Sequence, residues 1–218
     1  MNVFITGSSR GIGKEIKDFF TYNNHTVISP SRQELNLSDL HQVNDYLSNF
    51  NQEIDILINN AGVNDANLLE ELDIENLDYI LDTNFKSHLL ITQHFLKYFK
   101  ENKSGKIVNI SSVRTQIIKP GRFAYSLSKS SLHTLTKYVT LEFSKYNILC
   151  NTISPGYVIS EMLTRNNSPE VVNNMQNSIP IQKFCDPIEV AKLCYFLTVT
   201  NEYITGQDIA IDGGLTAL

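Results

Sequence analysis

The chain begins with a short apolar segment, a glycine-rich turn and the first turns of an amphipathic helix. Residues 2–6 are mostly apolar and β-branched, residues 7–13 carry three glycines, and apolar residues then recur at helical spacing. This order is typical of a dinucleotide-binding fold, because glycines let the backbone approach a pyrophosphate and a helix N-terminus offers unpaired N–H groups. A nucleotide-hydrolase phosphate loop is rejected, since Glu15 stands where Ser or Thr is required. A plain glycine turn is the remaining alternative.

The composition narrows the class of protein. With 218 residues, 42% hydrophobic and 19% charged, the chain suits one compact domain over residues 1–218. Its net charge of -5 makes nucleic acid a poor partner. Three cysteines without C-x-x-C and five histidines without ligand spacing predict no metal site, and they suit a reducing compartment. No signal segment or membrane-length apolar run is present, so we expect a cytoplasmic protein with no membrane partner.

The apolar runs predict an α/β fold. We expect a three-layer Rossmann fold with a doubly wound, mostly parallel sheet of about seven strands. Too few residues separate the second and third strands for a crossover helix, so one such helix is shortened or missing. The predicted strands are residues 2–6, 26–29, 34–37, 54–58, 106–110, 148–154 and 208–211, and the predicted helices cover 39–50, most of 71–101, 124–144 and 187–199.

Tyr125 and Lys129 form the candidate catalytic pair. Residues four apart lie on one face of a helix, so the phenol and the ammonium are neighbours. A free tyrosine has a pKa of about 10, and a shift of about three units takes roughly 4 kcal/mol. One cation at about 4 Å supplies on the order of 4 kcal/mol at an effective dielectric of about 20, so Lys129 with a second positive charge suffices. A solvated helix face is the competing interpretation of a lone Tyr-x-x-x-Lys.

The second strand indicates which dinucleotide binds. An acidic residue at its end would hold the ribose hydroxyls of NAD, but Ser31 and Arg32 stand near this position. The small Ser31 leaves space for a 2′-phosphate and Arg32 offers it a positive charge, and Arg10 in the glycine turn is placed to bind the same group. The sequence therefore predicts NADP(H) in preference to NAD(H). Solvated surface charges are the alternative for both arginines.

These motifs together resemble the short-chain dehydrogenase/reductase family nearly from end to end. The family's T-G-x-x-x-G-x-G motif corresponds to residues 6–13, its N-N-A-G to 59–62, its P-G to 155–156 and its D-G-G to 212–214. The resemblance assigns catalytic roles to Asn84, Ser112, Tyr125 and Lys129. Asn84 interrupts an apolar helical pattern, which also predicts a bound water or a local helix irregularity there.

The resemblance also implies how a bound cofactor is held. In two places this chain departs from the family: Asn36 stands where many members have an adenine-binding Asp, and Ser160 replaces a threonine. No metal is expected. The residues expected to contact the cofactor are Gly7, Ser9, Arg10, Gly11, Ile12, Gly13, Arg32, Asn36, Leu37, Asn60, Ala61, Gly62, Tyr125, Lys129, Pro155, Gly156, Val158 and Ser160.

The implied function is an NADP-dependent reduction of a carbonyl to an alcohol on a small-molecule substrate. Ser112 would polarise the carbonyl oxygen, Tyr125 would protonate it, and Lys129 would bind the nicotinamide ribose and lower the pKa of the tyrosine. Asn84 would fix a water that links Lys129 to solvent. The polar segment 157–183 suits a lid over the site.

Several alternatives stay open. One alternative is a 3-oxoacyl-carrier-protein reductase, whose substrate is bound to a carrier protein. A reductase of a sugar or polysaccharide pathway is a further alternative. A non-catalytic NADP sensor or scaffold is less favoured, because the four catalytic residues are all present. The helices that carry Asn84 and Tyr125 pair between subunits in related proteins, which implies a homodimer or homotetramer. Four lysines could meet an acidic carrier protein, but a solvated helix end and loop is the favoured interpretation: Lys97, Lys100, Lys103 and Lys106.

Overall fold

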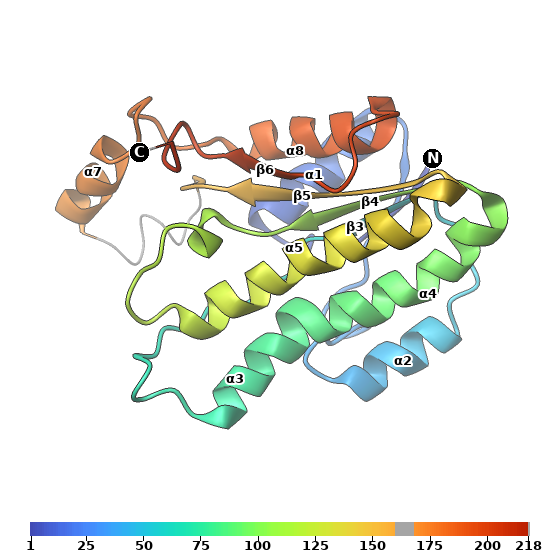
Figure 1. Cartoon of the computed structure of the whole chain (residues 1–218), viewed down its shortest axis with the longest axis horizontal. Helices are drawn as coiled ribbons and strands as arrows, with labels where there is room; N and C mark the ends of the chain where they lie inside the picture. The colour runs from blue at the N-terminus through green and yellow to red at the C-terminus, as the bar shows by residue number, and fades with distance from the viewer. Residues whose placement is uncertain (160–167, 218) are drawn as a thin grey trace.

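The computed structural model describes residues 1–159 and 168–217, which form a parallel sheet between two layers of helices (Figure 1). The strands are β1 (Asn2–Ile5), β2 (Thr26–Ile28), β3 (Ile56–Asn59), β4 (Gly105–Ile110), β5 (Ile148–Pro155) and β6 (Asp208–Ile211). The α-helices are α1 (Gly11–Tyr22), α2 (Leu40–Ser48), α3 (Ile74–Leu81), α4 (Ser87–Asn102), α5 (Phe123–Phe143), α7 (Pro169–Asn177) and α8 (Pro187–Tyr195). The Rossmann-type α/β fold is confirmed.

The strand order places the site. All six strands are parallel, in the order β2-β1-β3-β4-β5-β6. After β1, the chain adds β2 on one side of it and then adds β3 to β6 in turn on the other side. In such a sheet ligands bind beyond the carboxyl ends of the strands, at the point where the order reverses. The segments that follow β1, β3, β4 and β5 all emerge at this edge.

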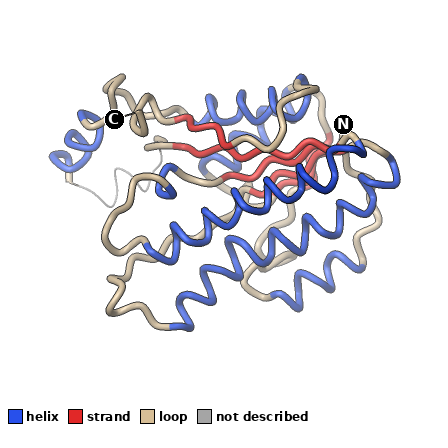
Figure 2. Tube along the Cα trace, in the orientation of Figure 1, coloured by secondary structure: helices blue, strands red, loops and turns tan. Residues whose placement is uncertain are grey.

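Both faces of the sheet are buried, which explains the continuous apolar runs of the strands. On one face Phe4, Leu57 and Ile107 pack in a cluster with side chains of α2, α4 and α5. On the other face their sequence neighbours Val3 and Ile58 pack with α1 and α8. Figure 2 shows the strands between these two helical layers. Alternate residues of each strand thus anchor different layers.

The predicted strand at residues 34–37 is wrong, and in the part of the chain that the structure describes the sheet has six strands. Leu35 and Leu37 are apolar because they pack in the core beside α2, at 4% and 8% exposure. Between them Asn36 is held in a loop, where its N–H donates to Gln42 and its side chain accepts from Ser38. A loop without strand or crossover helix therefore connects β2 to α2. A short alternating run does not distinguish a strand from a loop with two buried leucines.

Two other local predictions, for α8 and for the helix at Asn84, are confirmed. α8 begins at Pro187 behind the capping side chain of Asp186, which accepts from the N–H of Ile188 at 3.1 Å. The helix is irregular at Asn84, where a π-helical turn over Asp82–Lys86 joins α3 to α4. Within the described residues, no helix has the length and apolar character to cross a membrane. The same residues contain no His, Cys, Asp and Glu cluster able to hold a metal ion.

Candidate active site

α5 brings Tyr125 and Lys129 together at the edge where β4 ends. Lys129 is 3% exposed, its Nζ donates to the carbonyl of Ile110 at 2.8 Å, and it lies 5.9 Å from the centroid of the Tyr125 ring. The last residue of β4 therefore holds the ammonium. The four-residue spacing places both side chains on the same face of the helix, as predicted.

Ser112 enters the same site from β4. Its backbone is extended, and its Oγ accepts the N–H of Arg114 at 3.2 Å, which opens the short helical turn Val113–Thr115. The Ser112 hydroxyl also interacts with the Tyr125 phenol. The structure thus brings together three of the four predicted catalytic residues from two separate elements.

Within the chain alone, the pKa of Tyr125 is not lowered. Burial raises the pKa of the phenol above its ordinary value, and the Ser112 hydroxyl and the Arg114 charge oppose this rise without cancelling it. The expectation that Lys129 lowers this pKa is therefore not met by the chain itself, because Lys129 is directed to the Ile110 carbonyl and desolvation dominates. Tyr125 is a neutral phenol, the form that a proton donor needs.

Burial also acts on the ammonium of Lys129. It lowers the pKa of Lys129 to about 8, because the charged form loses its hydration. The positive charge of the site thus begins to fall at mildly alkaline pH. Gly62 lies directly beside this group, since a Cβ there would be 3.1 Å from Nζ of Lys129 and 3.5 Å from Oδ1 of Asn84.

Asn84 joins the site by holding the backbone after Gly62. Its Oδ1 accepts the N–H of Val63 at 2.8 Å, and its Nδ2 donates to the Val63 carbonyl at 2.8 Å and to Oγ of Ser128 at 3.0 Å. The amide therefore links the segment after β3 to α5. The water that Asn84 was expected to fix stays a prediction.

The glycine turn packs directly on the segment after β3. Gly7 has φ +70°, and a Cβ there would be 2.7 Å from Cα of Ala61. A Cβ on Gly13 would be 2.2 Å from the carbonyl oxygen of Gly7, so no larger residue fits. Asn60 donates to the carbonyls of Thr6 and Gly7, while Oγ1 of Thr6 accepts the N–H groups of Asn60 and Ala61. The glycine turn and the segment after β3, where the cofactor is expected to bind, are thus joined by hydrogen bonds.

The start of α1 fits a dinucleotide pyrophosphate. The extended residue Arg10 precedes α1 and makes no side-chain cap hydrogen bond, whereas Asp or Ser side chains cap α2, α3, α7 and α8. Gly11 has φ +57°, and a Cβ there would meet no atom of the described residues within 4 Å. The first N–H groups of α1 therefore lie beside open space, where an anion is stabilised. Ser9 and Arg10 are exposed, and Ile12 is half-buried.

The adenosine side is less open than the sequence indicates. Arg32 is exposed as expected, but the N–H of Ser31 donates to a carboxylate oxygen of Glu34 at 2.7 Å. A carboxylate thus lies where a 2′-phosphate was predicted. Asn36 is engaged within its loop, and the Leu37 side chain belongs to the core.

At the nicotinamide side, the predicted P-G and D-G-G motifs meet. Pro155 ends β5, and a Cβ on Gly156 would be 2.8 Å from Cβ of Asp212, so the glycine permits this contact. Val158 pairs with Cys185 in an isolated bridge. Ser160 lies outside the described residues, as does the 160–167 part of the predicted lid, whose later part contains α7.

Comparison with known proteins shows the family of this chain. A short-chain dehydrogenase family model, described as enoyl-(acyl carrier protein) reductase, matches residues 32–216. The 3-oxoacyl-[acyl-carrier-protein] reductase FabG of Thermotoga maritima is 32% identical over 237 residues, which cover 97% of this chain and 96% of the relative. The chain belongs to the short-chain dehydrogenase/reductase family. The acetoacetyl-CoA reductase of Acinetobacter sp. (strain RA3849) is 34% identical over 74% of this chain, but the match spans only 65% of that relative.

Solved structures of short-chain dehydrogenases share the whole fold. 4-Hydroxyisoleucine dehydrogenase complexed with NADH has a TM-score of 0.91 and 28% identity, with 100% of this chain and 99% of that chain covered. ElxO with NADP bound has a TM-score of 0.89 and 28% identity over the same shares. Both dinucleotides thus occur in proteins of similar structure.

Two histidines, His133 and His88, support the site. His133 contacts Oγ of Ser111 at 2.7 Å and lies 3.6 Å from Asp208, which ties α5 to β4 and β6. His88 is fully buried and contacts Oγ1 of Thr6 at 3.3 Å. His133 stands four residues after the candidate catalytic residue Lys129 on α5, and His88 stands four residues after Asn84, where the π-helical turn leads into α4. That spacing was the signal available in the sequence.

The four lysines considered as a contact for a carrier protein are not at the site. Lys97, Lys100 and Lys103 lie at the end of α4, and Lys106 lies at the start of β4, where its Nζ donates to the carbonyl of Asn201 at 2.9 Å. This is the amino edge of the sheet, while Tyr125 lies beyond the carboxyl edge. The 16 residues of α4 alone span about 24 Å.

Proposed function

We propose that this chain is an NADP(H)-dependent reductase that interconverts a carbonyl and an alcohol on a small-molecule substrate. The observation that carries the proposal is the convergence of Ser112, Tyr125 and Lys129 at the carboxyl edge of a dinucleotide-type sheet. Family membership and the open start of α1 support it. The matched relatives named first span more residues than this chain does, so the activity is proposed rather than transferred.

The residues act together on one oxygen atom. Ser112 donates a hydrogen bond to the substrate carbonyl oxygen, and Tyr125 donates its proton to the same oxygen as negative charge develops there. Lys129 holds positive charge beside the tyrosine and binds the nicotinamide ribose. Asn84 keeps Gly62 and Val63 in place next to this ammonium. The bound dinucleotide supplies the hydride, and the chain supplies placement and protons.

The preference for NADP(H) rests on two exposed arginines. Arg10 at the start of α1 and Arg32 after β2 carry the charges for a 2′-phosphate, and no acidic residue ends β2 itself. Glu34 opposes them from the Ser31 N–H. We propose that two positive charges outweigh one negative charge, so that NADPH binds more tightly than NADH.

Nucleotide binding and turnover test the proposal together. NADPH and NADH are titrated by fluorescence, and turnover is measured with a panel of carbonyl compounds that includes an acetoacetyl thioester. Tyr125→Phe should retain NADPH binding and lose about 10²–10⁴-fold in kcat, the usual contribution of a general acid. A wild-type protein that binds NADPH and reduces no carbonyl would instead support the sensor alternative. Failure to bind either nucleotide would remove the enzyme proposal.

A carrier-protein-bound substrate is a second candidate, favoured by the similarity to 3-oxoacyl-[acyl-carrier-protein] reductases. The lysine group at the amino edge does not support it, because a carrier docked there would lie on the far side of the sheet from Tyr125. A higher kcat/KM for an acetoacetyl thioester on a carrier protein than for the free thioester would favour this candidate.

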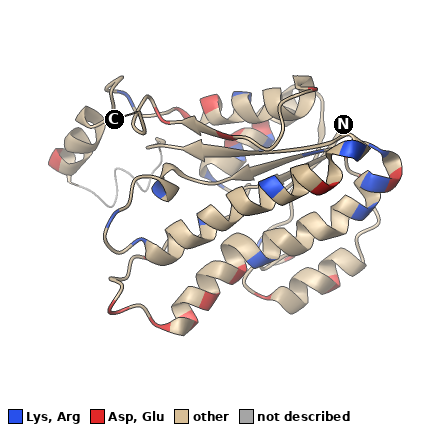
Figure 3. Cartoon of the chain, in the orientation of Figure 1, with Lys and Arg blue, Asp and Glu red and all other residues tan. Residues whose placement is uncertain are grey.

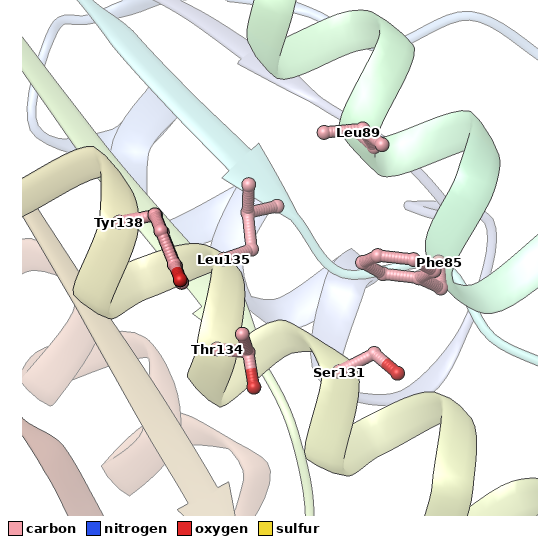
Figure 4. A pocket seen from close by; sticks show the side chains of 6 residues that line it. All are labelled: Phe85, Leu89, Ser131, Thr134, Leu135 and Tyr138. Carbon is pink, nitrogen blue, oxygen red and sulfur yellow. The ribbon is translucent and has the colours of Figure 1, made fainter.

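We further propose that the chain forms a homodimer through α4 and α5. These two helices lie side by side on one face (Figure 1), and a groove of about 310 Å³ runs between them (Figure 4). Phe85, Leu89, Leu135 and Tyr138 are among the residues that line it. Tyr138 is 60% exposed, and Leu141, three residues further along α5, is 82% exposed. Large exposed apolar side chains grouped on one face are typical of a subunit interface.

A further inference from the structure

The loop between β4 and α5 is basic within an acidic protein. Residues 102–141 contain no Asp or Glu, although the whole chain has 23 acidic and 18 basic residues. Figure 3 shows the basic positions along this loop, at the same edge of the sheet as the ends of β4 and β5. Three of them are Arg114, Lys119 and Arg122.

Arg114 and Lys119 both converge on Tyr157. Nη2 of Arg114 donates to the phenol oxygen of Tyr157 at 2.8 Å, and its guanidinium carbon lies 5.2 Å from the ring centroid. Nζ of Lys119 lies 5.5 Å from the same centroid. Tyr157 belongs to the segment after β5, so two different strand ends contribute to the cluster. We call Arg114, Lys119 and Tyr157 the basic cluster.

The described residues offer no counter-ion to the basic cluster. The ion pairs found in residues 1–159 and 168–217 use Lys14, Lys86, Lys192 and His133, and none uses Arg114 or Lys119. Two like charges held on one ring repel each other unless an anion lies between them. Arg114 has five N–H donors, of which one binds Tyr157 and one makes a long contact of 3.4 Å with the Ile117 carbonyl. Donors therefore remain for a ligand.

The basic cluster is continuous with the candidate catalytic residues. The N–H of Arg114 donates to Oγ of Ser112 at 3.2 Å, and the charge of Arg114 acts on the Tyr125 phenol. Burial raises the pKa of Tyr157, but the neighbouring Lys119 and Arg114 outweigh it and the pKa is lowered. A molecule whose carbonyl lies between Ser112 and Tyr125 thus has a second attachment point a few bonds away.

We propose that the substrate carries an anionic group, a carboxylate or a phosphate, near its reacting carbonyl, and that the basic cluster binds this group. The inference rests on the proposed carbonyl reduction and names its substrate class. A guanidinium binds two oxygens of either anion with parallel hydrogen bonds, and the Tyr157 hydroxyl adds a third donor. Fixing the anion orients the carbonyl toward Ser112 and Tyr125.

Matched substrate pairs test this inference. Acetoacetate is compared with methyl acetoacetate, and dihydroxyacetone phosphate with dihydroxyacetone, with NADPH as donor. We expect the wild type to favour the anionic member of one pair by about tenfold or more in kcat/KM, and the pair affected tells carboxylate from phosphate. Arg114→Met and Lys119→Met should each lower the ratio of kcat/KM for that anion to kcat/KM for its neutral partner by about tenfold, and this ratio cancels any effect of the Arg114 charge on Tyr125. Lys97→Met removes the same charge from the far edge of the sheet and is the control.

Further variants and a binding measurement keep the outcomes distinct. Tyr157→Phe removes a single hydroxyl and should weaken the same preference if Arg114→Met does not fold. Equal turnover of both members of each pair, a preference that survives both Met variants, or a faster reaction with the neutral acetoacetyl thioester would overturn the inference. If no carbonyl is reduced, the proposed function is contradicted. Calorimetry with acetoacetate and dihydroxyacetone phosphate then tests, without turnover, whether the basic cluster binds an anion. Loss of binding in Arg114→Met supports the inference, and no binding by the wild type overturns it.

Discussion

His88 is a fully buried histidine held in one tautomer. Oγ1 of Thr6 accepts two backbone N–H groups, from Asn60 and Ala61, so its own hydrogen is left for Nε2 of His88 at 3.3 Å. The ring nitrogen that receives this hydrogen bond is unprotonated, and the imidazole is neutral. Burial and the charge of Lys129 lower the pKa of His88 to about 3. Through Thr6, this buried ring therefore supports the start of the glycine turn.

The neutral state of His88 makes stability depend on pH. In the unfolded chain its pKa is about 6.5, so between pH 6.5 and 3 only the unfolded state binds the proton, and stability is lost as pH falls. At pH 5 the loss from this group is about 2 kcal/mol. Urea unfolding at pH 7 and pH 5 should show a smaller decline for His88→Gln than for the wild type. The exposed His41→Gln variant is the control, and an equal decline in both variants would contradict the assignment.

Glu34 opposes the proposed preference for NADP(H). Hydrogen bonds from Ser31 lower the pKa of its carboxyl, which keeps the group negative beside Arg32. Glu34→Gln retains the shape and removes the charge, so NADPH should bind about fivefold more tightly while NADH changes little. Arg32→Asp should act in the opposite direction. Fluorescence titration of both nucleotides measures the ratio, and the exposed Glu142→Gln variant controls for net charge. An unchanged ratio in Glu34→Gln would place the 2′-phosphate elsewhere.

Among the elements, those with a repeated pattern or a cap are predictable from the sequence. The apolar stripe of α5 and the Asp186–Pro187 start of α8 are local signals, and both helices form where expected. Residues 34–37 mislead because two buried leucines in a loop have the same alternation as a strand. The contact between Arg114 and Tyr157 was not predictable, since 43 residues separate them and two loops have to meet.

The cap of α8 has a measurable effect on stability. Asp186 satisfies the N–H of Ile188, and the helix then buries Val190, Ala191 and Cys194 against α1 and the sheet. Asp186→Ala should cost about 1 kcal/mol in the free energy of unfolding, because an N-terminal donor loses its partner. Asp45→Ala, at an exposed position inside α2, should cost nothing, since alanine is the better helix former. Urea unfolding of both variants gives the comparison, and equal stabilities would contradict the role of the cap.

At the scale of the whole molecule, the proposed homodimer uses the face formed by α4 and α5. A homodimer that buries this face should be stable only with its partner, so the melting temperature should rise with protein concentration. Leu141→Glu places a charge on the proposed interface, where burial without a partner is unfavourable, and should give a monomer. Light scattering coupled to gel filtration measures the mass, and it also separates a dimer from a tetramer.

The matched variant Tyr22→Glu introduces the same charge at an exposed aromatic residue that ends α1, in the opposite helical layer. It should leave the mass unchanged. α5 carries Tyr125 and Lys129, and the π-helical turn before α4 carries Asn84, so dissociation is expected to loosen the site as well as the interface. A Leu141→Glu monomer should therefore bind NADPH more weakly than the wild type, while Tyr22→Glu should not. A wild type that is monomeric at all concentrations, with full activity, would show that this face has another role.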